Sequence, residues 1–179
     1  MRPVIFLDFD GPLLPKRGFY HPDNQTVMPR TYDPYAIGMI EWCASKVNAH
    51  YVISSTWRDS GRGWIVALLK ENRVSVDRLH PDWATPRYGG GSMATRTEEI
   101  LLWLNQHPEV QQWVAIDDMG DPKKLPNLIK VTEEDGFLLR HFNQMCKLLK
   151  ITARIEDQLL IPSEFLTSSG IPPINITDG

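Results

Sequence analysis

The fold of this chain is decided by residues 4–11, which run Val4-Ile5-Phe6-Leu7-Asp8-Phe9-Asp10-Gly11. The unbroken apolar run at 4–7 predicts a short strand buried on both faces, as in the middle of a parallel sheet. Asp8 and Asp10 follow it, and because side chains alternate along an extended chain, both project to the same side. Such a pair suits Mg2+, which takes one or two carboxylates and keeps its other positions for water and phosphate. For the pair taken alone, the alternative is a solvated acidic strand end.

Length and composition are those of an ordinary globular domain. The chain has 179 residues, of which 42% are hydrophobic and 23% charged, and its formal net charge is -3, so bulk attraction to a polyanion is not expected. Cys43 and Cys146 lie in apolar helical patterns without metal or redox spacing, which indicates free thiols in a reducing compartment. No segment reaches transmembrane length and the first acid, Asp8, comes too early for a signal peptide, so we expect a cytoplasmic protein without a membrane partner.

Apolar strands alternate with amphipathic helices along the chain, which predicts an α/β fold with three Rossmann-like layers, a central parallel sheet covered by helices on both faces. The strands are expected at 4–7, 51–53, 74–79, 113–116 and 128–131. The helices are expected after an Asp33-Pro34 cap, after Gly61 and Gly63, behind a capping box at 95–98, and from about residue 138. A loop rich in proline and glycine is expected over 81–93.

The domain organisation predicted from this pattern is simple. We expect one domain over residues 1–150, followed by an extension over 151–179. The extension carries spaced apolar residues, which leave open a closing helix, a dimer contact or a partner-binding strand. The sequence does not predict the oligomeric state.

Polar side chains gather where the predicted strands end. The second strand is followed by Ser, Ser and Thr at 54–56, whose hydroxyls can donate to phosphate oxygens without adding charge. The strand at 113–116 is followed by Asp117 and Asp118, which suit completion of a Mg2+ shell. Arg96 stands in the first turn of a capped helix, where the guanidinium and the helix N-terminus both favour an anion. Because ligands of open parallel sheets bind beyond the carboxyl ends of the strands, these side chains predict a Mg2+ and phosphate site.

The order of these residues resembles the haloacid dehalogenase (HAD) superfamily of Mg2+-dependent phosphohydrolases. Its motifs are an Asp-x-Asp after strand one, a Ser or Thr after strand two, a Lys or Arg on a later helix and a final acidic pair. The matching residues here are Asp8 with Asp10, Ser54, Arg96, and Asp117 with Asp118. Over residues 3–150 the segments FLDFDG, VISSTWR, RTEEILLWL and AIDD are similar to the HAD domain of Swiss Army Knife RNA repair proteins. The chain departs from the pattern in Pro12, where a β-branched residue is more usual, and in Arg96, where many members carry lysine.

The resemblance implies a HAD fold with little or no cap domain and a reaction in two steps. Asp8 would attack phosphorus to form an aspartyl-phosphate, and Asp10 would protonate the leaving oxygen and later take a proton from water. Mg2+ would be held by Asp8, the carbonyl of Asp10 and Asp117, with Asp118 as a water-orienting group or alternative ligand. The other phosphate oxygens would be held by Ser54, Ser55 and Arg96.

The substrate is less constrained than the reaction. Without room for a large cap, an open site favours a bulky substrate such as a phosphorylated nucleic-acid end or a nucleotide. Trp57 and Arg58 could then contact the substrate by stacking on bases, with core packing as the alternative for the tryptophan. A small-metabolite phosphatase and a non-catalytic binding module on the same scaffold are the alternative functions. A signalling receiver would carry its aspartates in another order.

Overall fold

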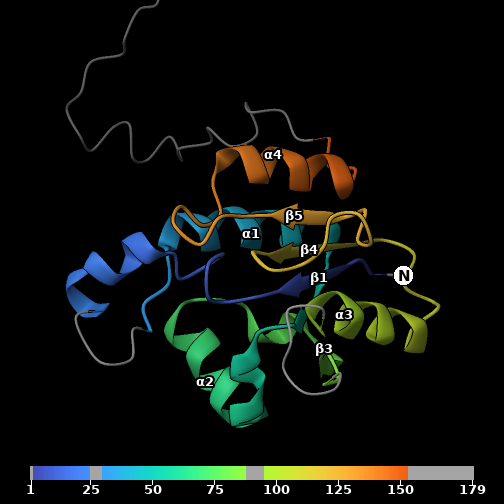
Figure 1. The fold of residues 1–179 in the computed structure, drawn as a ribbon, viewed down its shortest axis with the longest axis horizontal. Helices are drawn as coiled ribbons and strands as arrows, with labels where there is room; N and C mark the ends of the chain where they lie inside the picture. The colour runs from blue at the N-terminus through green and yellow to red at the C-terminus, as the bar shows by residue number, and fades with distance from the viewer. Residues whose placement is uncertain (1, 25–29, 88–94, 153–179) are drawn as a thin grey trace, which may run out of the picture.

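The structure is a computed structural model that describes residues 2–24, 30–87 and 95–152 (Figure 1). Its strands form one parallel sheet with the order β3-β2-β1-β4-β5. The strands are β1 (Val4–Leu7), β2 (His50–Ile53), β3 (Leu79–Ala84), β4 (Trp113–Asp117) and β5 (Leu128–Lys130). The central strand, β1, is fully buried, as its unbroken apolar sequence predicted.

Helices lie on both faces of the sheet, which confirms the three-layer Rossmann-like fold. In the described part of the chain the α-helices are α1 (Pro34–Val47), α2 (Arg62–Glu71), α3 (Thr95–Gln106) and α4 (Leu139–Leu148). Apolar residues of α1, α2 and α4 share one core cluster with Ile5 and Leu7 of β1. Those of α3 share a second cluster with Val4 and Phe6, which point to the other face. Figure 1 shows α1 and α4 together on one side of the sheet and α3 on the other.

Helix α1 begins as its sequence predicted. The carboxylate of Asp33 accepts hydrogen bonds from the backbone N–H groups of Tyr35 and Ala36, and Pro34 occupies the first turn. Helix α3 begins at Thr95, so this residue is already helical rather than the cap that the sequence predicted. The difference is a single residue, which is within the usual uncertainty of a helix boundary.

The third strand is the largest error of the sequence prediction. It was expected at 74–79 but runs over Leu79–Ala84, and the preceding segment contains a short 3-10 helix, η4 (Val76–Arg78). Residues 81–84 were expected in a loop because Pro81 and Asp82 disfavour strands. Strand β3 tolerates them because it is an edge strand, where a missing N–H need not interrupt a ladder.

The connection from β1 to α1 runs over residues 8–33 and forms no separate domain in its described part. It contains two 3-10 helices, η1 (Lys16–Tyr20) and η2 (Pro22–Asn24). The buried amide of Asn24 donates to the carbonyls of Gly18 and Thr31 and accepts from the N–H groups of Arg30 and Thr31. One buried side chain thus joins two parts of this connection, at residue 18 and at residues 30–31.

Other expectations concern the cysteines, the membrane and the tail. Cys43 on α1 and Cys146 on α4 are free thiols whose sulfurs lie 3.7 Å apart. Within the described ranges, every helix is too short or too polar to cross a membrane. The proposed extension begins at 151, and residues 153–179 lie outside the described part.

Candidate active site

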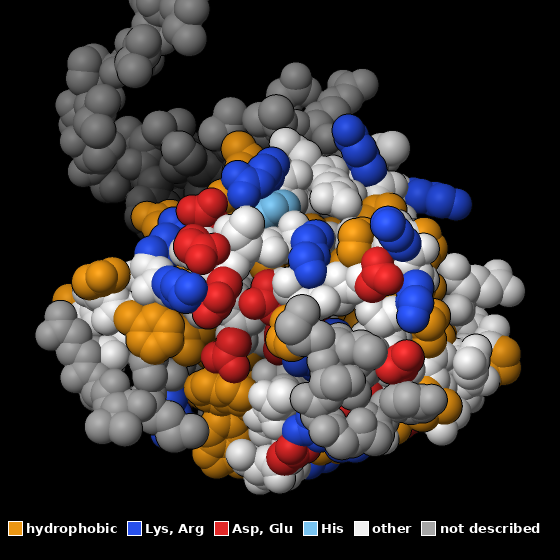
Figure 2. Space-filling model, viewed as in Figure 1, with side chains coloured by type: hydrophobic (Ala, Val, Ile, Leu, Met, Phe, Trp, Pro, Cys, Tyr) orange, Lys and Arg blue, Asp and Glu red, His pale blue; other side chains and the backbone are white. Residues whose placement is uncertain are grey.

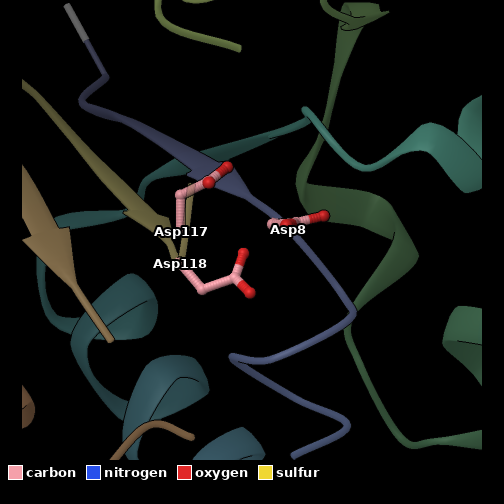
Figure 3. A group of neighbouring side chains, drawn as sticks. All are labelled: Asp8, Asp117 and Asp118. Carbon is pink, nitrogen blue, oxygen red and sulfur yellow. The ribbon is translucent and has the colours of Figure 1, made fainter. Parts of the chain in front are cut away.

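Three aspartates meet at the carboxyl edge of the two central strands. Asp8 follows β1, Asp117 is the last residue of β4 and Asp118 comes next. One carboxylate oxygen from each lies within 4.8 Å of the others, and Figure 3 shows the three side chains grouped at the strand ends. The pairing of Leu7 with Ile116 explains this, because it places Asp8 level with Asp117 on the neighbouring strand. The strand-end prediction therefore placed these three acids near one another, as the structure does, and their role as metal ligands stays a prediction.

The acid cluster is buried, which changes its protonation. Asp8 and Asp117 are almost completely inaccessible and Asp118 is half-buried. Burial, reinforced by the neighbouring Asp117 carboxylate, raises the pKa of Asp8 to about 8 against the opposing charge of Arg96. Burial also raises the pKa of Asp117 and of Asp118. The cluster therefore favours either a bound proton or a bound cation.

The residues present fit a divalent metal ion of the Mg2+ type. Carboxylate oxygens are hard ligands, and octahedral Mg2+ at roughly 2.1 Å from each ligand spaces its ligands by up to about 4.2 Å. That spacing applies to ligands on opposite sides of the ion and neighbouring ligands lie closer, so the three oxygens, which lie within 4.8 Å of one another, would close in around a bound ion. Asp117 is already oriented, because its Oδ1 accepts from the N–H groups of Met119 and Gly120 at 2.7 and 3.1 Å. Its buried Oδ2 has no aligned hydrogen bond.

Arg96 is the counter-charge of this cluster. From the first turn of α3 its Nε approaches Asp117 Oδ2 at 3.0 Å and its Nη2 approaches Asp8 Oδ1 at 3.5 Å. Its Nε and Nη1 are nevertheless buried without an aligned hydrogen bond among the described residues. Arg96 thus compensates the charge of the acids in the free protein and also has N–H donors that could bind a phosphate oxygen.

The two serines after β2 differ in what they can do. Ser54 lies level with Asp8, because Leu7 pairs with Ile53, and its buried Oγ has no hydrogen-bond partner in the described structure. The hydroxyl of Ser55 is also buried, but its Oγ accepts from the N–H of Trp57 and caps the 3-10 helix η3 (Thr56–Ser60). Ser54 therefore remains a candidate for phosphate binding, whereas Ser55 has a structural partner.

Arg58 was expected to contact the substrate by stacking, but the structure places its side chain in the protein interior. Its guanidinium is buried, donating from Nε to the carbonyl of Thr85 at 2.9 Å and from Nη1 to the carbonyls of Ser54 and Ser55. Its Nη2 pairs with the buried carboxylate of Glu99 at 2.7 Å. Arg58 thus links the loop after β2, the end of β3 and helix α3. Its buried guanidinium is not exposed for stacking on a base.

Asp10 and Trp57 form a pair beside the acid cluster. The indole Nε1 of Trp57 donates to Asp10 Oδ2 at 2.7 Å. The side chain of Asp10 is therefore not a member of the three-carboxylate group, although its backbone carbonyl was the predicted ligand. Neither this pair nor the ion pairs of Glu99 were predicted from the sequence. The one indication for Glu99 was its position three residues after Arg96, because side chains three apart on a helix are neighbours.

The comparison with protein families agrees with this geometry. A family model described as the HAD domain in Swiss Army Knife RNA repair proteins matches residues 4–142. The chain belongs to this family. The match spans the sheet and the whole acid cluster, so the resemblance inferred from the sequence motifs is confirmed. No curated protein and no solved structure matched the chain.

Membership of the HAD family supports HAD-type phosphohydrolase chemistry in general. The loop after β1 also explains a glycine of this chain. Gly11 has φ +82°, and a Cβ at this position would lie 2.9 Å from Cγ of Asp118. A side chain here would both strain the backbone and displace an acid of the cluster.

We expect Gly11→Ala to lower the affinity for Mg2+ by roughly 10-fold or more, as loss of a ligand's support does in other metal sites. Gly61→Ala is the matched control, because Gly61 also has positive φ (+88°) but its Cβ would meet no atom within 4 Å. Both variants should lose stability through backbone strain of about 1–3 kcal/mol. Calorimetric titration with Mg2+ measures the difference, and equal affinities in the two variants would contradict this account of Gly11.

Proposed function

We propose that this protein is a Mg2+-dependent phosphoric monoester hydrolase that acts through an aspartyl-phosphate on Asp8. The observation that carries the proposal is the buried group of Asp8, Asp117 and Asp118 at the carboxyl edge of the sheet, with Asp10 beside it but outside it. Such a division supplies one carboxylate for attack and a separate one for proton transfer. The favoured substrate is a phosphorylated nucleic-acid end or a nucleotide, in keeping with the RNA-repair description of the family.

Asp8 is held in a fixed orientation for attack. Its Oδ1 accepts from the N–H of Phe9 at 2.9 Å and faces the guanidinium of Arg96. When bound among the three acids, Mg2+ supplies positive charge that lets an anionic nucleophile approach an anionic phosphate. The Asp8 carboxylate then displaces the leaving oxygen from phosphorus, and water later releases phosphate from Asp8.

Asp10 is suited to the proton transfers of both steps. Its side chain is exposed, so a leaving group can reach it, yet partial burial raises its pKa, with the Trp57 N–H opposing the shift. A raised pKa keeps more of this group protonated near neutral pH, as a general acid requires. After donating its proton, the carboxylate can take one from the attacking water.

The non-reacting phosphate oxygens have two matching groups. The Oγ of Ser54 is buried and lacks a partner in the described structure, and the Nε and Nη1 of Arg96 lack aligned ones. A buried hydroxyl without a partner is costly in a folded protein, which makes Ser54 a candidate for ligand binding, whereas Arg96 is ion-paired with Asp8 and Asp117 and would share its donors with the phosphate. Donors arranged before the reaction begins stabilise the charge that develops on phosphorus oxygens.

A small-metabolite phosphatase remains a second candidate because of the charge around the site. Figure 2 shows acidic side chains gathered on this face among basic ones. The exposed cations Lys16, Arg17 and Arg87 are paired with carboxylates rather than left for a phosphate backbone. This arrangement suits a single phosphate better than a long polyanion.

Phosphate release from a substrate panel tests the proposal. The panel contains free nucleotides, sugar phosphates, and DNA and RNA oligonucleotides with 5'- or 3'-phosphates, each with Mg2+ or with EDTA. We expect release from oligonucleotide ends or nucleotides that EDTA abolishes. Release confined to sugar phosphates would favour the metabolite enzyme, and no release from any compound would overturn the proposed function in favour of a binding module.

A further inference from the structure

The contact between Trp57 and Asp10 joins residues 47 positions apart. An indole N–H can only donate, so the oxygen that it faces, Oδ2, is favoured as an acceptor. In the protonated carboxyl group the proton is then favoured on Oδ1. The contact therefore distinguishes the two oxygens of a side chain that is otherwise exposed to solvent.

The indole is itself held in place. Its ring meets Phe9 edge to face, with centroids 6.2 Å apart, and Trp64 at 5.4 Å with a tilt of 49°. Its backbone N–H is bound by Ser55 Oγ in the cap of η3. The same 3-10 helix is tied to the sheet by Arg58, whose guanidinium binds the carbonyls that precede it. Trp57 is thus a donor with little freedom to move.

The backbone of Asp10 is fixed independently of its side chain. The N–H groups of Leu13 and Leu14 both donate to the carbonyl of Phe9, and the N–H of Gly11 donates to the carbonyl of Leu14. Asp10 and Leu14 form an isolated bridge within this tight loop. The loop fixes the position of the Asp10 backbone, and the indole of Trp57 fixes the position of the Asp10 carboxyl group.

We propose that Trp57 is a positioning residue, which holds Asp10 so that Oδ1 faces the leaving oxygen. The inference rests on the proposed function and assigns Trp57 a role other than stacking on bases. In the first step the Asp8 oxygen bonds to phosphorus, the bond from phosphorus to the leaving oxygen breaks, and the proton moves from Asp10 Oδ1 to that oxygen. In the second step Asp10 takes a proton from water, whose oxygen bonds to phosphorus as the Asp8–phosphorus bond breaks, and the acid is restored.

The role can be tested through the leaving group. A p-nitrophenolate ion leaves without protonation, whereas the alkoxide of an alkyl or nucleoside ester requires it. Trp57→Phe keeps an aromatic ring and removes only the donor and part of the ring system. We expect it to lower kcat/KM for an alkyl phosphate by roughly 10-fold or more, a fraction of what general acids contribute. The loss for p-nitrophenyl phosphate should stay below about 3-fold, since no proton transfer is needed there.

Two further variants make the experiment specific. Trp42→Phe is the matched control, because the Trp42 ring contacts Phe142 and Lys46 rather than Trp57 or Asp10, and any loss should be equal for both substrates. Asp10→Asn should show the same selective loss as Trp57→Phe, but larger. In the Asp10→Asn background, adding Trp57→Phe should have no further selective effect, because the two residues act as a unit.

The outcomes separate this role from the proposed function. Equal losses for both substrates would make Trp57 a packing residue and overturn the positioning role alone. A loss confined to nucleotide substrates, expressed in KM and independent of the leaving group, would overturn it in favour of stacking. Absence of phosphate release by the wild type would overturn the proposed function and the role of Trp57 with it.

Discussion

Replacement of Asp8 by asparagine is expected to reduce phosphate release by about 10^4-fold or more, the scale on which loss of a covalent nucleophile acts. Asparagine has nearly the same shape and keeps an oxygen that can accept from the N–H of Phe9, so the loop after β1 should keep its conformation. What it lacks is the negative oxygen that bonds to phosphorus. Release is measured with the best substrate of the panel at saturating Mg2+.

A measurement of stability separates inactivity from unfolding in the same variant. In the metal-free wild type burial raises the pKa of Asp8 from the ordinary value of 3.8 to about 8. Between these values the unfolded chain loses a proton that the folded protein keeps, so the free energy of unfolding falls as the pH rises from about 4 to about 8. Asp8→Asn removes this loss and should melt higher than the wild type at pH 8 in EDTA, with the difference vanishing near pH 4. Retained turnover would refute the nucleophile assignment, and a lower melting temperature at pH 8 would refute the raised pKa.

The sequence predicted the parts of the fold that are buried on both faces. Strand β1 is apolar along its length and β4 is apolar up to its last residue, Asp117, because both of their faces contact helices, and that composition is visible without a structure. Strand β3 lies at the edge, where exposed residues such as Pro81 and Asp82 are tolerated, so its composition resembles that of a loop. The prediction of strand position was wrong for β3, where residues are exposed and burial does not require an apolar sequence.

In the candidate site, too, some features could be predicted from the sequence and others could not. Asp8, Asp117 and Asp118 could be placed together because parallel strands end at one edge, which follows from topology alone. The partners of Trp57 and Arg58 could not be predicted, since they lie far away in the sequence, Asp10 for the indole and Glu99 for the guanidinium. Hydrogen bonds between such distant side chains depend on loop conformations. The spacing of apolar residues along the sequence does not predict these conformations.

Arg96 offers the second large effect, because it is a buried cation surrounded by acids. Its guanidinium faces Asp8, Asp117 and Glu99, all nearly inaccessible to solvent. Arg96→Met fills similar space without charge and leaves these carboxylates without their partner. Breaking a buried ion pair in this way destabilises by about 3–5 kcal/mol. We expect a loss of that size in the free energy of unfolding, measured at pH 8 in EDTA, and a much smaller loss for Arg96→Lys, which keeps the charge.

Mg2+ should reverse part of this loss, since a divalent cation supplies positive charge to Asp8 and Asp117 in place of the arginine. The stability deficit of Arg96→Met is therefore expected to shrink in saturating Mg2+. Its affinity for Mg2+ should equal or exceed that of the wild type, because a competing charge has gone. Phosphate release should still fall by about 10^2- to 10^3-fold, as when one donor to a reacting group is removed. A fall in the Mg2+ affinity of Arg96→Met would contradict this account. It would mean that Arg96 orients the acids for the metal, rather than neutralising their charge and donating hydrogen bonds to phosphate.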